Sequence, residues 1–276
     1  MANENTSRNI DTLQFMIDSD LPSDVIFAIK ESYKTIRANI VLSLVKDGCK
    51  KLVITSSVPA EGKTTTSINL AIALSMVDKK VLLIDSDLRK NRIGKYLKLQ
   101  HNKGLTDIIR DEATFEEVLN ITKFPNLHIL ASGSSVINPA EVIASKLTQM
   151  FLDKVSENYD YIILDAPPIN IVSDALPLIK NSDGVIFVAR EMFTNHREIK
   201  KALSSLSLIE APILGLVYIG SDTTQPYYHS TYYGRYGKYG KYGKYGRYGK
   251  YNHYGKYYGY GYGYSDDTPS KKKKNK

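Results

Sequence analysis

Six short apolar runs, separated by longer stretches of helical periodicity, constrain the fold of this chain more than any other feature. The runs are LVIT (52–55), VLLID (81–85), LHIL (127–130), YIILD (161–165), GVIFVA (184–189) and ILGLVYI (213–219). Candidate helices lie at 23 to about 45 and at about 64–77, 105–120, 139–157, 172–180 and 195–208. Near-continuous apolar runs are typical of strands buried on both faces. The alternation predicts an α/β fold: a mostly parallel central sheet flanked by helices on both faces.

Composition divides the chain into three segments. Residues 1–22 are polar and are expected to be flexible, and residues 23–221 carry the strand–helix pattern. Residues 222–276 have no aliphatic residue, so they cannot form a core and are expected to be disordered. The net charge of +8 is concentrated there: residues 227–276 hold 12 Lys+Arg against 2 Asp+Glu, a local charge of +10. The basic pI therefore describes the tail, and the folded part gives no reason to expect nucleic-acid binding.

Cysteine content and targeting signals point to a cytoplasmic protein. Cys49 is the single cysteine, so no intramolecular disulfide is possible, which fits a reducing compartment. The N-terminal stretch lacks the apolar core of a signal peptide, and no apolar run of 18 residues is present. The five histidines are scattered and show no metal-ligand spacing. Contact with a membrane is therefore expected only through a partner or through surface charge.

The first apolar run continues into a loop and a helical stretch, LVITSSVPAEGKTTTSINLAIAL (52–74). Such a loop, with a helix N-terminus behind it, forms an anion cradle in which Lys63 reaches the β- and γ-phosphates of ATP and the Thr64 hydroxyl binds Mg²⁺. The usual pattern G-x-x-x-x-G-K-[ST] has Ser57 at its first glycine here, and the alternative is an ordinary helix start; the flanking strand and helix favour the ATP site. The candidate nucleotide-binding residues are Ser57, Pro59, Ala60, Glu61, Gly62, Lys63, Thr64 and Thr65.

Two other apolar runs end in an aspartate, Asp85 in VLLID and Asp165 in YIILD. The carboxyl ends of parallel strands meet at one edge of a sheet, where the phosphate loop also leaves its strand. A carboxylate at that edge can hold Mg²⁺ directly or through water. A helix N-cap is the simpler interpretation of one such acid alone. Two acids beside a phosphate loop indicate metal and phosphoryl chemistry.

The segments SSVPAEGKT (56–64), VLLIDSDLR (81–89) and YIILDAP (161–167) together resemble the Walker A, A′ and B motifs of bacterial tyrosine kinases. These are the capsule and exopolysaccharide autokinases of the CpsD/CapB/Wze type, P-loop NTPases related to ParA and MinD. The resemblance covers roughly residues 25–221. It implies an ATP- and Mg²⁺-dependent protein-tyrosine kinase that regulates export or polymerisation of a surface polysaccharide.

The resemblance also implies roles for single residues. The implied catalytic residues are Lys63, Asp85, Asp87 and Asp165. Thr64, Asp85 and Asp165 would act around the metal, and Asp87 would orient or deprotonate the acceptor tyrosine. Arg89 would position the acidic motif. GSSVINPAEVIAS (133–145) resembles the Asn-Pro-x-Glu helix start of the family.

Two departures from the family pattern bear on assembly and on the nucleotide, and a third, from the ParA/MinD pattern, argues against a partition ATPase. ESYKTIR (31–37) resembles the E-x-x-R-x-x-R oligomer contact through Glu31, Lys34 and Arg37, but Lys34 lacks the bidentate geometry of an arginine. The alternative is a solvated charged stripe. Ile219 stands where relatives tend to have an asparagine near the base. ParA/MinD ATPases carry a signature lysine early in the phosphate loop, and TSSV (55–58) has none.

The tail repeats tyrosine, glycine and a basic residue, as in YGRYGKYGKYGKYGRYGKY (233–251). Glycine keeps such a chain flexible, so each phenol can reach the in-line position at the γ-phosphate of a neighbouring subunit. The tail is therefore predicted to be the substrate of the kinase, phosphorylated in trans within a homo-oligomeric ring. The candidate acceptors are Tyr227, Tyr228, Tyr232, Tyr233, Tyr236, Tyr239, Tyr242, Tyr245, Tyr248, Tyr251, Tyr254, Tyr257, Tyr258, Tyr260, Tyr262 and Tyr264.

Other interpretations of the tail stay open, and partners follow from the family. Basic residues between aromatics also bind polyanions, and the lysine run 271–274 could contact anionic lipid. The alternative function is an ATP-gated MinD/ParA-like assembly ATPase whose tail binds a polyanion or a membrane surface.

The resemblance implies a membrane-embedded CapA/CpsC/Wzz-like activator on a separate chain and a phosphotyrosine phosphatase. The chain would then lie in the cytoplasm, at the inner face of the membrane.

Overall fold

The computed structural model describes residues 9–10, 14–17, 19–99 and 103–220. Within these ranges eight strands form one sheet in the order β1-β4-β5-β3-β6-β2-β7-β8. The strands are β1 (Asn9–Ile10), β2 (Lys50–Ser56), β3 (Val81–Asp85), β4 (Asn120–Thr122), β5 (Leu127–Leu130), β6 (Tyr161–Asp165), β7 (Gly184–Arg190) and β8 (Ile213–Ile219). All neighbouring pairs are parallel except β4 and β5. The predicted fold class is confirmed.

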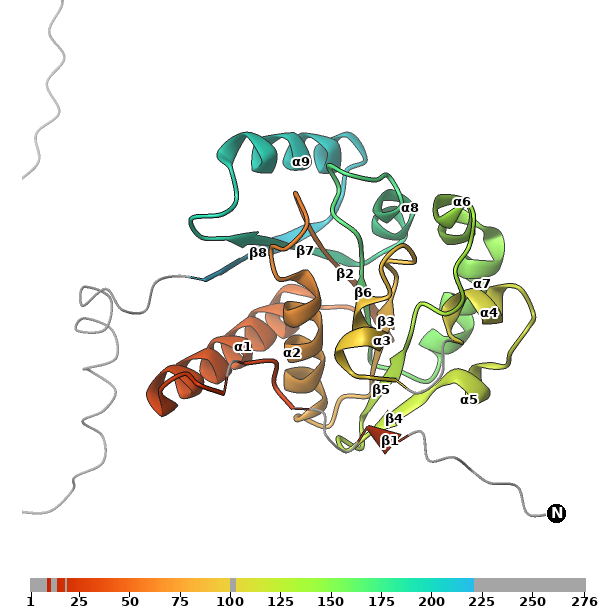
Figure 1. Ribbon diagram of the computed structural model, residues 1–276, viewed down its shortest axis with the longest axis horizontal. Coiled ribbons are helices and arrows are strands. Elements are labelled where there is room, and N and C mark those ends of the chain that lie inside the picture. The colour runs from red at the N-terminus through yellow and green to blue at the C-terminus, as the bar shows by residue number, and fades with distance from the viewer. Residues whose placement is uncertain (1–8, 11–13, 18, 100–102, 221–276) are drawn as a thin grey trace, which may run out of the picture. The chain divides into compact units, whose positions relative to one another are not determined.

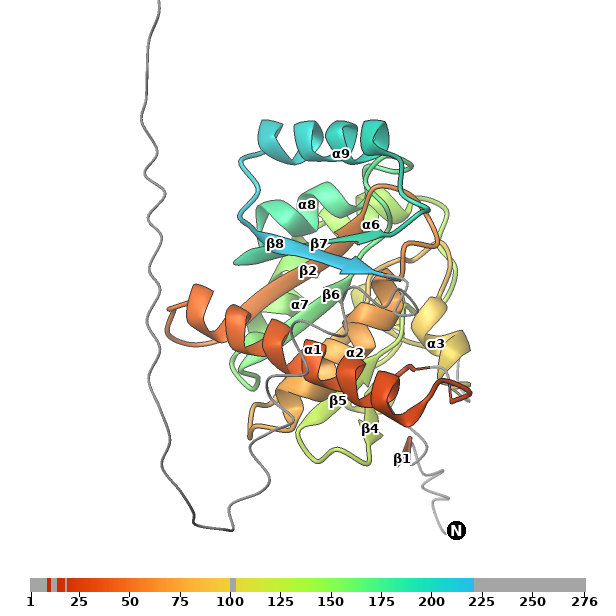
Figure 2. The ribbon, with the colours of Figure 1, turned by 90° about the vertical axis from the view of Figure 1, so that its left-hand side faces the viewer.

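Each of the six predicted apolar runs forms a strand, and nine helices lie in the described ranges. The helices are α1 (Ser23–Ser43), α2 (Lys63–Ser75), α3 (Arg92–Tyr96), α4 (Leu105–Ile109), α5 (Phe115–Val118), α6 (Pro139–Ala144), α7 (Lys146–Ser156), α8 (Ala175–Lys180) and α9 (His196–Leu208). They cover both faces of the sheet: in Figure 1 and Figure 2, α1 and α2 lie on one face and α7, α8 and α9 on the other.

The strands alternate their side chains between two apolar clusters, one on each face of the sheet. On β2, Leu52 and Ile54 pack with the helix α2 cluster, whereas Val53 between them packs with residues from α4 to α9. Burial of both faces explains why the runs are apolar throughout and show no period of two. Helix α2 lies almost wholly in the interior, which fixes the position of the loop that precedes it.

Two predicted helices are each divided in the structure. Asp111 has a φ of +58°, which ends the stretch that begins with α4, and Thr114 starts α5 by accepting a hydrogen bond from the Glu117 backbone N–H at 3.3 Å. Ser145 separates α6 from α7, because its side chain accepts from the Thr148 backbone N–H at 3.1 Å and caps the second helix. The continuous helices expected over 105–120 and 139–157 were therefore wrong.

Candidate active site

The phosphate loop lies between the end of β2 and the start of α2. Gly62, directly before α2, has a φ of +87°, in the left-handed region that favours glycine. A Cβ atom at this position would lie 2.1 Å from the Cδ1 atom of Ile219. No other residue therefore fits at 62 without displacing Ile219. The contact also places Ile219, which the family resemblance links to the base, against the phosphate loop at the end of β8.

Lys63 and Thr64 occupy the first turn of α2, and each is 4% exposed. The Thr64 hydroxyl donates to the Asp165 Oδ2 atom at 2.7 Å, and the Ser67 hydroxyl donates to Oδ1 at 3.0 Å. Asp165 ends β6 and is in register with Asp85 at the end of the neighbouring β3. The structure thus brings the predicted loop and the two predicted acids together at one edge of the sheet.

Burial dominates the electrostatics of this edge. It raises the pKa of Asp165 to about 6, although the hydrogen bond from Thr64 and the charge of Lys63 lower it. Burial also raises the pKa of Asp85 well above its usual range, and the charge of Asp165 adds to this effect. Burial lowers the pKa of Lys63 below its ordinary value, and the charge of Asp165 offsets part of this effect. Charges here are poorly solvated, so a cation or a phosphate group interacts with them strongly.

The two aspartates of the Asp-Ser-Asp motif have different surroundings. Both carboxylate oxygens of Asp85 accept backbone N–H groups, from Asp87 at 3.2 Å and from Ile93 at 2.9 Å. Asp85 therefore fixes the turn after β3 and the start of α3. The Asp87 side chain is 5% exposed, and its carboxylate accepts no hydrogen bond from the part of the chain that the structure describes. Its lone pairs are therefore not used by the described residues.

Arg89 forms a two-point ion pair with Asp174, the residue before α8. Its Nε atom lies 2.6 Å from Oδ2 and its Nη2 atom 3.2 Å from Oδ1. The hydrogen bond with Asp174 raises the pKa of Arg89. The pair joins the segment that follows β3 to the start of α8, which agrees with a positioning role for Arg89.

The residues at the edge of the sheet fit a magnesium ion. The Thr64 hydroxyl and the carboxylates of Asp165 and Asp85 are hard oxygen ligands, the kind that Mg²⁺ takes. No group of three or more His, Cys, Asp or Glu side chains within the described ranges could enclose a metal by itself. An ion held here would share its ligands with water and with nucleotide phosphates, as Mg²⁺ does at phosphoryl-transfer sites.

The other predicted residues lie away from this edge. Glu31 and Lys34 form an ion pair of 2.6 Å on the surface of α1. The Arg37 Nη1 atom donates to the Ala73 carbonyl of α2 at 2.7 Å, so this side chain links the two helices. The sixteen candidate acceptor tyrosines lie outside the described residues.

Three polar residues of the site were not predicted from the motifs. Ser67 donates to Asp165, and its place one turn after Thr64 on α2 could have indicated it. The Thr194 hydroxyl donates to Glu61 Oε1 at 2.5 Å, and Asn170 donates its backbone N–H to the Ser57 carbonyl at 3.2 Å. Neither belongs to a motif, and no local pattern links Thr194 to a loop 133 positions earlier.

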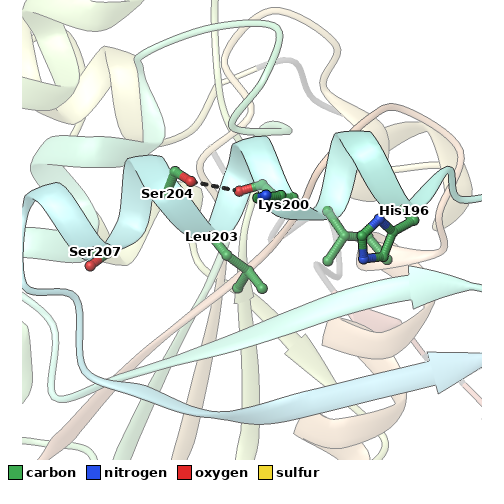
Figure 3. Close-up of a pocket in the computed structure, with 6 residues that line it drawn as sticks. His196, Lys200, Leu203, Ser204 and Ser207 are labelled. Atoms are coloured by element: carbon green, nitrogen blue, oxygen red, sulfur yellow. Dashed lines mark hydrogen bonds between the residues drawn. The ribbon is translucent and has the colours of Figure 1, made fainter. Parts of the chain in front are cut away.

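A shallow groove of about 370 Å³ lies along α9, apart from the site just described. His196, Leu203 and Ser207 line it, and Figure 3 shows them along α9, above the strands. The groove contains none of the predicted site residues.

Within the described ranges, no helix combines the length and the apolar character that a membrane span requires.

A strand–loop–helix phosphate site with acids on two adjoining strands defines a P-loop nucleotide-binding protein. The AAA domain family matches residues 49–210. Tyrosine-protein kinase YwqD of Bacillus subtilis (strain 168) is 36% identical over 75% of this chain and 86% of the relative. Putative tyrosine-protein kinase CapB of Staphylococcus aureus is 33% identical over 75% of this chain and 90% of the relative. The chain belongs to this family of bacterial tyrosine-protein kinases, which confirms the resemblance of its motifs.

Solved structures agree with this assignment. The chimerical protein CapA2B2 superposes with a TM-score of 0.68 at 30% identity, over 76% of this chain and 91% of that one. The kinase domain of Escherichia coli tyrosine kinase ETK gives 0.66 at 25% identity, over 69% and 75%. The septum site-determining protein MinD of Pyrococcus horikoshii gives 0.50 at 24% identity, over 62% and 70%, a likeness of fold alone.

Proposed function

We propose that this protein is an ATP–Mg²⁺-dependent tyrosine autokinase that phosphorylates its own C-terminal tyrosine cluster. The observation that carries the proposal is the edge of the sheet where Lys63 and Thr64 meet Asp165 and the Asp85 motif. Lys63 neutralises phosphate charge, and Thr64 and Asp165 hold the cation, which supplies charge neutralisation when bound. The Asp87 carboxylate accepts the proton of the attacking tyrosine hydroxyl.

The tail supplies the acceptors in this proposal. Sixteen tyrosines lie between Tyr227 and Tyr264, in a segment with a local charge of +10. Each phosphate adds about −1.5 to −2 charges, so full modification reverses the sign of the tail. Phosphorylation occurs in trans between subunits of a ring, and the resulting like-charge repulsion separates them. A phosphatase restores the starting state.

Partners and location complete the proposal. The tyrosine-protein kinases CapB and CpsD are relatives of this chain, and with the family resemblance they support a role in regulating capsular or exopolysaccharide polymerisation and export. A CapA/CpsC/Wzz-like membrane protein activates the kinase and holds it at the inner face of the membrane. The chimerical protein CapA2B2 joins a CapA and a CapB element in its name, which supports such a pairing.

Intact mass spectrometry of the full chain tests the function. We expect incubation with ATP and Mg²⁺ to add steps of about 80 Da, one per phosphoryl group, which peptide mapping assigns to residues 227–264. The incubation is run with and without the cytoplasmic segment of the activator, and Lys63→Met is the control. An unmodified mass in both conditions, with ATP still bound, contradicts the autokinase. That outcome favours the alternative, an ATP-gated assembly protein whose tail binds a polyanion or a membrane.

The contact residues of α1 give a prediction about assembly. We expect Arg37→Ala to lower the melting temperature by removing the hydrogen bond to the Ala73 carbonyl, a loss of about 1 kcal/mol. The surface variant Lys34→Ala is expected to keep the melting temperature but to weaken self-association, measured by light scattering after size-exclusion chromatography. If Lys34→Ala and Lys34→Arg assemble like wild type, the charged stripe is only a solvated surface.

A further inference from the structure

The Glu61 carboxylate lies inside the phosphate loop and is fully buried. It accepts the Ser57 hydroxyl at 2.8 and 3.1 Å and the Val58 backbone N–H at 2.8 Å. It also accepts the Thr194 hydroxyl at 2.5 Å. A buried carboxylate is stable only with such partners, so every donor in this set matters for the conformation of the loop.

The Glu61 carboxylate is not expected to hold phosphate itself, because it repels the triphosphate. Its side chain is instead directed at residues of its own loop and at Thr194. The loop also contains Ala60 with a φ of +67°, a conformation that a residue with a Cβ atom adopts only when its surroundings impose it. Glu61 therefore shapes the loop from within.

Thr194 connects this carboxylate to the end of β7. Its hydroxyl donates to Glu61 and accepts the Arg190 backbone N–H at 2.8 Å, so both hydrogen-bonding functions are used. The Thr194 backbone N–H donates to the Arg190 carbonyl at 2.9 Å. The turn after β7 is thus closed on itself and presents the hydroxyl at a fixed point.

A second contact joins the same region to the loop. Asn170 donates its backbone N–H to the Ser57 carbonyl, and its side-chain amide donates to Glu198 at 2.8 Å (Oε2) and 2.9 Å (carbonyl). The phosphate loop is therefore held by the turn after β7 through Thr194 and by the segment between β6 and α8 through Asn170, which is itself bonded to Glu198 of α9. Thr194 and Asn170 both lie outside the Walker-type motifs, and only their partners in the loop belong to one.

We propose that Thr194 is a positioning residue for nucleotide binding: through Glu61 it keeps the phosphate loop in the conformation that accepts the phosphates, without contacting the nucleotide itself. The proposal rests on the nucleotide site of the proposed function, but not on the kinase reaction. When a binding-competent conformation is less populated, the apparent affinity falls by the same factor. Loss of one charge-assisted hydrogen bond in a buried network is large enough to change the equilibrium between loop conformations by about tenfold.

The first test is isothermal titration of the full chain with Mg-ADP. We expect Thr194→Val, which keeps the shape and removes the hydroxyl, to raise the dissociation constant about tenfold. Thr194→Ser keeps a hydroxyl and is expected to restore binding to within about threefold. Met192→Ala, in the same turn but fully exposed, is the matched control and is expected to bind like wild type.

Further readouts separate positioning from a purely structural role. We expect Thr194→Val to raise the KM for ATP while kcat at saturating ATP stays near wild type, because the catalytic groups are intact. The double variant Glu61→Gln/Thr194→Val is expected to bind no more weakly than the weaker single variant, since Thr194 acts on the loop through Glu61.

Two results overturn the proposal: Mg-ADP binding by Thr194→Val within twofold of wild type, or a lowered melting temperature with unchanged affinity and KM. The kinase hypothesis fails separately, if wild type binds Mg-ADP but leaves its tail unmodified.

Discussion

Asp87→Asn is expected to reduce the rate of tail phosphorylation by about 10²- to 10⁴-fold, the usual contribution of a general base. Asparagine has nearly the same shape but cannot accept the tyrosine proton. The Asp87 carboxylate bonds to no described residue, so the substitution breaks no structural contact of that side chain. The rate is measured as phosphotyrosine formed under single-turnover conditions, and the dissociation constant for Mg-ADP is measured beside it.

Asp78→Asn is the matched control for this experiment. Asp78 is exposed, and asparagine tolerates its positive φ of +55°. We expect this variant to behave like wild type in both assays. A near-normal phosphorylation rate in Asp87→Asn would remove Asp87 from the reaction. A parallel loss of Mg-ADP affinity would show that it acts in binding.

Asp165→Asn is expected to abolish the kinase and also to stabilise the nucleotide-free protein. Burial raises the pKa of Asp165 from the ordinary 3.8 to about 6, so the folded protein holds this proton more tightly than the unfolded chain. The contribution of this group to stability therefore falls as the pH rises from about 4 to about 6. The shift corresponds to at most about 3 kcal/mol at neutral pH, or several degrees in melting temperature. The amide carries no charge and avoids this loss.

Melting temperatures recorded between pH 4 and pH 8 check this expectation. The difference between Asp165→Asn and wild type should be small near pH 4 and should reach its maximum above pH 6. Asp153→Asn is the contrast, because hydrogen bonding to Lys51 lowers the pKa of Asp153 and the sign is reversed. A variant at position 165 that melts below wild type at pH 7 would mean that its bonds to Thr64 and Ser67 outweigh the buried charge.

The sequence predicted the strands that carry the site but not β1 and β4, the two outermost strands at one side of the sheet. Burial of both faces makes a strand a continuous apolar run, and each of the six runs became one. Strands β1 and β4 are two and three residues long, too short for any pattern to emerge. The prediction of one helix over 105–120 was wrong for a related reason. The positive φ of Asp111 interrupts the helix at one residue, and the periodicity of the side chains does not reveal such an interruption.

The site divides in the same way. Lys63, Thr64 and the two strand-end aspartates were predictable, because parallel strands carry their carboxyl ends to one edge. The contact between Glu61 and Thr194 was not, since it depends on how far the turn after β7 reaches. Sequence motifs contain the residues that contact the ligand. The residues that support those contacts can lie far away in the sequence and are found only from the three-dimensional structure.

The position of Ile219 at the end of β8 has a consequence for the proposed order of tail modification. The polypeptide leaves the last strand beside the phosphate loop, and Tyr227 follows eight residues after Ile219. An extended chain spans at most about 3.5 Å per residue, so the leash of Tyr227 is about 28 Å at most, and that of Tyr264 is more than five times longer. In the proposed reaction between subunits, a phenol reacts only if this length spans the distance to the neighbouring active site, and the length also sets its effective concentration there. We therefore expect an insertion after Gly220 to change which tyrosines react first, without altering a residue of the site.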